Sequence, residues 1–273
     1  MNYTQENIRN LLISGHGGSG KTSLVEALVY YTKGTDRLGR TDDGNTVCDF
    51  DPEEIRRKAS LSLALASAEY SDTKLNLIDV PGLFDFELGI HEGMPAADGA
   101  VICVSARDGL EVGSKKAYKL AHKYNKPTMF YVSKIDVENA DFYKVFEELK
   151  AEFGPSICPV VVPVEQAGGR IYINLIKMEA YSYVNGAAHT VPMPSFGHRL
   201  DGLVEAMSEA VAETDEELME KFFSGEAFTQ EELQRGVKAG IKSGSITPVF
   251  CGSSTKLDCI DAMLHYMKHL MPC

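Results

Sequence analysis

Short apolar runs alternate along the chain with segments in which apolar residues recur at helical spacing. The apolar runs predict strands at residues 11–13, 75–78, 100–104, 128–132 and 247–251. The helical spacing predicts helices at 21–32, 115–123, 140–153 and 260–270. Because strands and helices alternate, we expect an α/β fold with a mostly parallel central sheet flanked by helices.

Residues 158–245 break this pattern. Alternating runs at 160–164, 171–176 and 180–184 predict further strands, and a helical stretch follows them. Two T-x-x-E sequences, Thr214 with Glu217 and Thr229 with Glu232, are capping-box signals for helix starts. The sequence therefore predicts an inserted α+β subdomain at 158–245, within a core formed by 1–157 and 246–273.

Composition narrows the class of protein. Hydrophobic residues make up 44% and charged residues 24% of the chain, as in ordinary globular proteins. Residues 1–9 are polar and lack the apolar segment of a signal peptide. The apolar runs are too short to predict a membrane-spanning helix. The six cysteines form no C-x-x-C pair, which favours reduced thiols and a cytoplasmic protein.

The charge is acidic and uneven. Residues 205–232 carry −9 of the net charge of −12. This balance argues against a broad nucleic-acid-binding face, and we expect no sequence-specific DNA contact and no membrane contact. The acidic segment is either a solvated helix face or a docking surface for a partner.

The strongest chemical signal follows the first strand. Residues 15–22 read GHGGSGKT, which matches G-x-x-x-x-G-K-[ST] between a predicted strand and a predicted helix. In this motif, backbone N–H groups and a helix N-terminus surround phosphate oxygens. Lys21 supplies a charge to the phosphates, and the Thr22 hydroxyl is a Mg²⁺ ligand. The predicted nucleotide contacts here are His16, Gly17, Gly18, Ser19, Gly20, Lys21, Thr22 and Ser23.

A second motif follows the strand at 75–78. Asp79 begins a D-x-x-G sequence, which places a carboxylate where it would hold Mg²⁺. The N–H of Gly82 would sense the terminal phosphate of a nucleoside triphosphate.

A third motif follows the strand at 128–132 and selects the base. Asp136 of the S-K-I-D sequence would accept hydrogen bonds from guanine, which adenine cannot donate. The stem of Lys134 would cover the base, and Ser133 stands where an asparagine is usual. Backbone N–H groups of Gly252, Ser253 and Ser254, after the last core strand, would reach the guanine oxygen.

These motifs, in this order, resemble elongation factor G and its tetracycline-resistance ribosomal-protection relatives. The resemblance covers residues 8–272 and is specific at 43–55, 134–142 and 249–256, and at 213–225 in a region similar to the family's G′ insertion. It implies a P-loop NTPase fold that binds GTP or GDP with Mg²⁺ and hydrolyses GTP. It also implies the ribosome as partner, through the stalk protein and ribosomal RNA, for a monomeric domain of a longer factor.

The resemblance assigns further roles and shows departures. It makes 34–62 the first switch region, with Ser60 in place of the threonine that reaches Mg²⁺. Lys21 and Gly82 would act in catalysis, but Leu83 replaces the histidine that orients the attacking water. We therefore expect hydrolysis that is slow or dependent on a partner. Gly17 and Gly18 replace larger residues and predict a more open phosphate site.

Three hypotheses remain open from the sequence. The first is a GTP-hydrolysing switch in which 34–62 and 81–86 order around the nucleotide. The second is a non-hydrolysing, nucleotide-sensing ribosome-interaction module, which Leu83 and Ser133 suggest. The third is a P-loop ATPase or kinase.

Overall fold

The computed structural model describes residues 3–166, 168–194 and 198–273. The ranges expected for the core and the insertion include 1–2, 167 and 195–197, and those parts lie outside the described residues. None of the helices in the described part of the chain has the length and apolar character that a bilayer-spanning segment requires.

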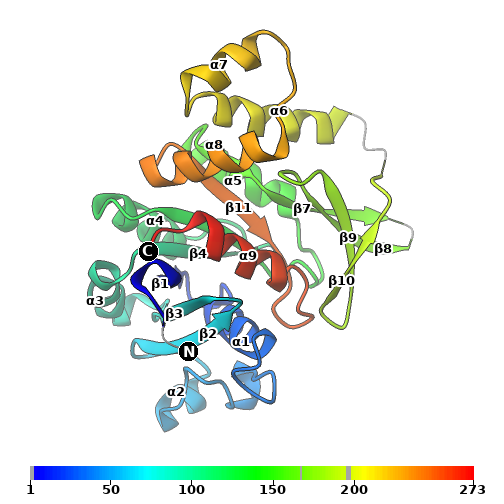
Figure 1. Ribbon diagram of the computed structural model, residues 1–273. Helices are drawn as coiled ribbons and strands as arrows, with labels where there is room; N and C mark the ends of the chain where they lie inside the picture. The colour runs from blue at the N-terminus through cyan, green and yellow to red at the C-terminus, as the bar shows by residue number, and fades with distance from the viewer. Residues whose placement is uncertain (1–2, 167, 195–197) are drawn as a thin grey trace.

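A seven-stranded sheet forms the centre of the molecule (Figure 1). The strand order is β2-β3-β1-β4-β5-β11-β6, and every neighbouring pair is parallel except β2 with β3. The strands are β1 (Ile8–Gly15), β2 (Ala64–Tyr70), β3 (Thr73–Asp79), β4 (Gly99–Ser105), β5 (Thr128–Ser133), β6 (Ile157–Pro159) and β11 (Thr247–Cys251). The predicted fold class is confirmed. β2 and β6 were not predicted, and the boundary expected between 157 and 158 falls inside β6.

Helices cover both faces of this sheet. The helices are α1 (Lys21–Tyr31), α2 (Pro52–Arg57), α3 (Leu88–Ala96), α4 (Val112–Lys123), α5 (Phe142–Phe153), α6 (His198–Ala212), α7 (Glu216–Phe223), α8 (Gln230–Ser243) and α9 (Ile260–Leu270). Alternate residues of β1 show the two faces. Leu11 packs in one apolar cluster with Leu24 of α1, whereas Leu12 packs in another with Met94 of α3. Burial on both faces explains why the strands appear in the sequence as continuous apolar runs.

A second, antiparallel sheet and three helices lie beside the core (Figure 1). The sheet has the order β10-β9-β8-β7, with β7 (Val161–Gln166), β8 (Gly169–Asn174), β9 (Glu179–Val184) and β10 (Ala187–Val191). The first three strands overlap the runs predicted at 160–164, 171–176 and 180–184, and β10 was not predicted.

Tyrosine hydroxyls tie the second sheet to the core. Tyr172 donates to Asp258 at 2.9 Å, and Tyr183 donates to Asp261 at 2.7 Å. Both acceptors lie at the start of α9 or just before it, so the sheet is anchored to the last helix of the core.

The two capping-box signals have different outcomes. Thr229 caps α8, and the reciprocal bond from the Thr229 N–H to the Glu232 carboxylate completes the box, as predicted. The Thr214 signal was wrong, because Asp215 is the N-cap of α7 and accepts from the Glu217 N–H. The Thr214 hydroxyl donates instead to the carbonyl of Val211, in the preceding helix.

The segment 34–52, whose content of Gly, Asp and Thr is typical of a mobile loop, is anchored in the structure. Glu26 of α1 is buried, and its carboxylate accepts from the N–H groups of Gly39 and Val47. Cys48 and Asp49 are buried as well. Backbone hydrogen bonds and these buried residues therefore hold the segment against the core, while most of its charged side chains, such as Asp42 and Asp43, remain exposed.

Two helical glycines provide a test of the packing. A Cβ on Gly240 of α8 would lie 2.5 Å from Ile246, which is buried, whereas a Cβ on Gly202 of α6 would meet no described atom within 4 Å. Gly240→Ala should destabilise the fold by about 1–3 kcal/mol through overpacking. Gly202→Ala should stabilise it by up to about 1 kcal/mol, the ordinary helix preference for alanine. Urea unfolding of both variants measures this difference, and equal stabilities would contradict the packing described.

Candidate nucleotide-binding site

One cavity of about 460 Å³ lies where the carboxyl ends of the parallel strands meet. Its walls come from the loops after β1, β3, β5 and β11 and from the segment 38–60. Parallel strands place such loops at one edge of a sheet, where open α/β folds bind ligands.

The loop after β1 wraps around one end of the cavity. Gly18 and Gly20 have φ angles of 80° and 89°, in the left-handed region that favours glycine. Gly20 is the N-cap of α1, so the helix N-terminus points into the cavity. Lys21 is buried, its Nζ donates to the His16 carbonyl at 2.8 Å, and burial lowers the pKa of its ammonium group.

Most of the predicted phosphate-loop residues reach the cavity, but two do not. Gly17, Gly18, Gly20, Lys21, Thr22 and Ser23 line it. The side chain of His16 turns away toward α4, where its Nδ1 accepts from the Gly113 N–H and its Nε2 lies 3.3 Å from Glu111. Ser19 is fully buried beneath the loop. A direct ligand contact by the side chain of His16 or Ser19 is therefore not supported.

Four oxygen-bearing side chains gather beside Lys21. The Thr22 hydroxyl donates to Asp79 at 2.7 Å and lies 3.2 Å from the Ser60 hydroxyl, which donates to Asp49 at 2.6 Å. The structure thus brings together the three predicted metal ligands, Thr22, Ser60 and Asp79. It adds Asp49, which the sequence analysis missed.

Two carboxylate oxygens in this cluster suit a cation. Asp79 Oδ1 and Asp49 Oδ2 are buried without a hydrogen-bond partner in the described part of the chain. Burial raises the pKa of Asp79 to about 7, although Lys21 and Thr22 act in the opposite direction. An uncompensated buried carboxylate is costly, and a hard divalent cation with oxygen ligands removes that cost. The residues present therefore fit Mg²⁺.

Asp136 lies at the other end of the same cavity. Its side chain is 11% exposed, and its Oδ2 accepts from the Thr255 hydroxyl at 3.3 Å. Lys256 Nζ lies 3.9 Å from the same oxygen. Lys134, Ser254 and Thr255 also line the cavity at this end. The roles of Thr255 and Lys256 were not predicted, although both follow directly after the predicted Ser254.

The expectation for Gly252 and Ser253 needs correction. The N–H of Gly252 donates to Val132 O, and the N–H of Ser253 donates to Asp258 O, each at 3.1 Å. These two N–H groups hold the end of β11 in place and are not available to a base. Of the three predicted residues, Ser254 is the one that lines the cavity, and its hydroxyl lies 3.5 Å from the Tyr131 hydroxyl.

Ser133 ties the two ends of the site together. Its hydroxyl donates to the Ser19 carbonyl in the phosphate loop at 2.6 Å, and it is fully buried. The hydroxyl that replaces an amide here therefore supports the loop from below.

Comparison with known proteins agrees with this arrangement. The family described as "Elongation factor Tu GTP binding domain" matches residues 6–273. The chain belongs to that family. It is a GTP-binding domain of the elongation-factor type, from the translational GTPases.

A solved structure extends the comparison. The chain is similar to a protein from Thermus thermophilus known from a crystal structure, with 32% sequence identity and a TM-score of 0.90. The match covers 98% of this chain and 40% of that protein. The chain thus spans well under half of the relative's length.

The Ser133 contact yields a prediction for this GTP-binding domain. Ser133→Ala should lower the free energy of unfolding by about 1–3 kcal/mol, because it leaves the buried Ser19 carbonyl without its donor. Ser224→Ala is the matched control. That hydroxyl also donates to a backbone carbonyl, at 2.7 Å, but it is exposed. Its loss should change stability by less than about 0.5 kcal/mol. Chemical denaturation compares the two, and an equal effect would contradict the role given to Ser133.

Proposed function

We propose that this domain is a Mg²⁺-dependent GTP-binding and GTP-hydrolysing switch that works on the ribosome. The observation that carries the proposal is the shared cavity, with a phosphate loop and an acidic cluster at one end and Asp136 at the other. A guanine nucleotide requires both kinds of end in one site, because it carries a phosphate tail and a base.

The chain's own residues would divide the work of binding. Backbone N–H groups of the loop after β1 would cradle phosphate oxygens, and Lys21 would turn from the His16 carbonyl to the phosphates. Asp136 would accept hydrogen bonds from guanine, and Lys134 would cover the base. Thr22, Ser60, Asp79 and Asp49 would hold Mg²⁺, which when bound supplies positive charge to the phosphate oxygens.

Hydrolysis would transfer the terminal phosphoryl group of GTP to water and release GDP and phosphate. Lys21 and the Gly82 N–H would stabilise negative charge on the transferred group. Leu83 follows Gly82 and is 41% exposed, and its side chain offers no hydrogen bond to orient water. The proposal therefore includes slow intrinsic turnover and stimulation by the ribosome. Leu83 also supports the second candidate, a module that senses the nucleotide without hydrolysing it.

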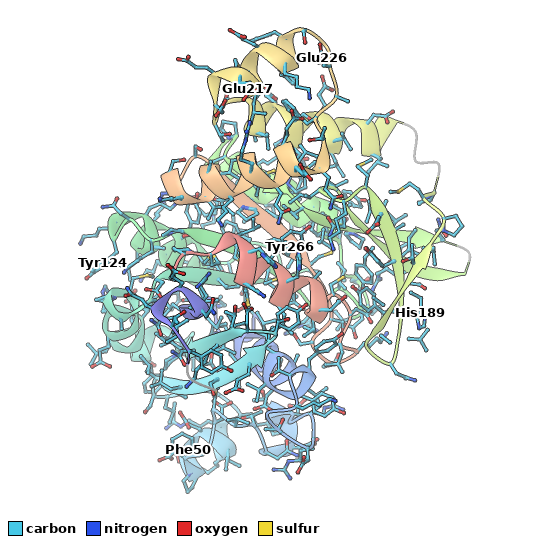
Figure 2. The ribbon with its side chains drawn as sticks, in the orientation of Figure 1. Phe50, Tyr124, His189, Glu217, Glu226 and Tyr266 are labelled. Carbon is cyan, nitrogen blue, oxygen red and sulfur yellow. The ribbon has the colours of Figure 1, made fainter. Side chains whose placement is uncertain are left out.

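The acidic helices suggest where a partner would bind. Residues 205–232 carry a net charge of −9, and Glu217 and Glu226 extend from the end of the molecule formed by α6 and α7 (Figure 2). A basic partner surface would complement this end. We propose contacts with the ribosomal stalk protein here and with ribosomal RNA elsewhere, for a monomeric, cytoplasmic domain. The six free cysteines are consistent with that compartment.

Base selection can be tested at Asp136. Asp136→Asn should weaken GTP binding about 10- to 100-fold, because a charged acceptor is lost, and should improve binding of xanthosine triphosphate. Titration calorimetry with GTP and with xanthosine triphosphate measures both affinities. Asp141→Asn, which changes a carboxylate that caps α5, is the matched control and should leave both affinities unchanged. Unaltered GTP binding by the Asp136 variant would remove the basis for guanine recognition.

Hydrolysis can be tested at Leu83. Single-turnover GTP hydrolysis by the unaltered chain should be slow and should rise when ribosomes are added. Leu83→His should raise the rate without ribosomes by about 10²–10⁴-fold, the usual contribution of a water-positioning group. Leu88→His, at an exposed leucine of α3, should not change it. No turnover under any of these conditions would favour the non-hydrolysing module.

A further inference from the structure

A second cavity lies next to the phosphate end of the nucleotide site. It has a volume of about 300 Å³ and includes residues of α3, α4 and the segment after β3. Pro81, Phe84, Ile90 and Leu120 form much of its apolar wall. Leu83 lines both this cavity and the nucleotide cavity, so its side chain stands at their boundary.

The segment after β3 lies directly on the phosphate loop. A Cβ on Gly82 would lie 2.8 Å from the backbone nitrogen of Gly17 and would also collide with Lys21 Nζ. A Cβ on Gly17 would lie 2.8 Å from Leu83 Cδ2. Leu83 therefore occupies space over the loop that is open because residue 17 has no side chain.

The position of Gly82 and Leu83 over the phosphate loop affects how many phosphate groups a bound nucleotide can have. The backbone of the loop and Lys21 are the groups proposed above to bind phosphate, and Gly82 is the group proposed to sense the terminal one. With Gly82 and Leu83 against Gly17, little room remains there for a terminal phosphate. A diphosphate, which lacks that group, requires no displacement.

We propose that Leu83 is a positioning residue that acts as an apolar latch on the phosphate loop. Over Gly17 it favours nucleoside diphosphate, and it moves into the adjacent apolar cavity when a terminal phosphate enters. The apolar wall of that cavity suits a leucine side chain, which is 41% exposed in its position over Gly17. The inference rests on the proposed guanine-nucleotide site and adds a residue that sets its preference between GDP and GTP.

Gly17 makes the latch testable through a pair of variants. Gly17 has a φ outside the left-handed region, so alanine is compatible with its backbone, unlike at Gly18 or Gly20. The atom that the new methyl group would meet is the flexible end of Leu83. Gly17→Ala should therefore push Leu83 off the loop, and Leu83→Ala should remove the obstacle itself.

The measurement is the affinity for a non-hydrolysable β,γ-imido analogue of GTP divided by the affinity for GDP, with Mg²⁺ present. Leu83→Ala should raise this ratio about tenfold, within the range of contact energies between neighbouring residues. Gly17→Ala should raise it in the same direction. The double variant should show no larger rise than the stronger single variant, because both changes remove one obstacle. Leu88→Ala, the nearby exposed leucine outside both cavities, should leave the ratio unchanged.

Two outcomes would overturn the latch. One is an unchanged or lower ratio for Leu83→Ala, and the other is a double variant whose effect equals the product of the two single effects. Failure of the proposed function looks different, because then the unaltered chain would bind neither nucleotide. If the chain binds both nucleotides and the affinity ratio does not change on substitution of Leu83, the nucleotide site is supported and the latch is contradicted.

Discussion

The parallel register of the central sheet is the constraint on which the site depends. In this register Ile13 of β1 lies opposite Asp79 of β3, and Ser105 of β4 lies opposite Ser133 of β5. The loops that follow these strands therefore begin at the same edge, although they are far apart in sequence. A shift of one residue in any pair would turn alternate side chains to the other face and separate the acidic cluster from the phosphate loop.

Buried charge is the main electrostatic cost of this arrangement. Asp49 and Asp79 are buried close to the buried ammonium group of Lys21, and the buried carboxyl of Glu26 lies near Asp49. Glu26 is compensated by two backbone N–H groups, whereas Asp49 and Asp79 each retain an unpaired oxygen among the described residues. This end of the domain thus holds buried carboxyl groups whose ionised form a bound cation would stabilise.

The sequence predicted the buried parallel strands other than β6 and the loops that follow them, because both leave strong local patterns. β2 was missed since its ALASAEY sequence has small residues where a strand normally shows large apolar ones. α3 was missed because it contains two glycines and Pro95, which are poor helix formers. Asp49 was missed because its burial depends on contact with Ser60 and on the fold of the preceding loop, which no short motif encodes. The prediction that the N–H groups of Gly252 and Ser253 contact the base was wrong for a different reason. The motif identified the correct segment, but these N–H groups donate to backbone carbonyls elsewhere in the fold.

The tyrosine anchor of the second sheet has a mechanical consequence. Tyr172 of β8 bonds to Asp258, and Asp258 exchanges two backbone hydrogen bonds with Ser253, directly before the cavity-lining Ser254 and Thr255. Force applied to the antiparallel sheet is therefore transmitted through a few stiff bonds to the wall beside Asp136. A displacement of the antiparallel sheet would therefore act on the base end of the cavity through these hydrogen bonds.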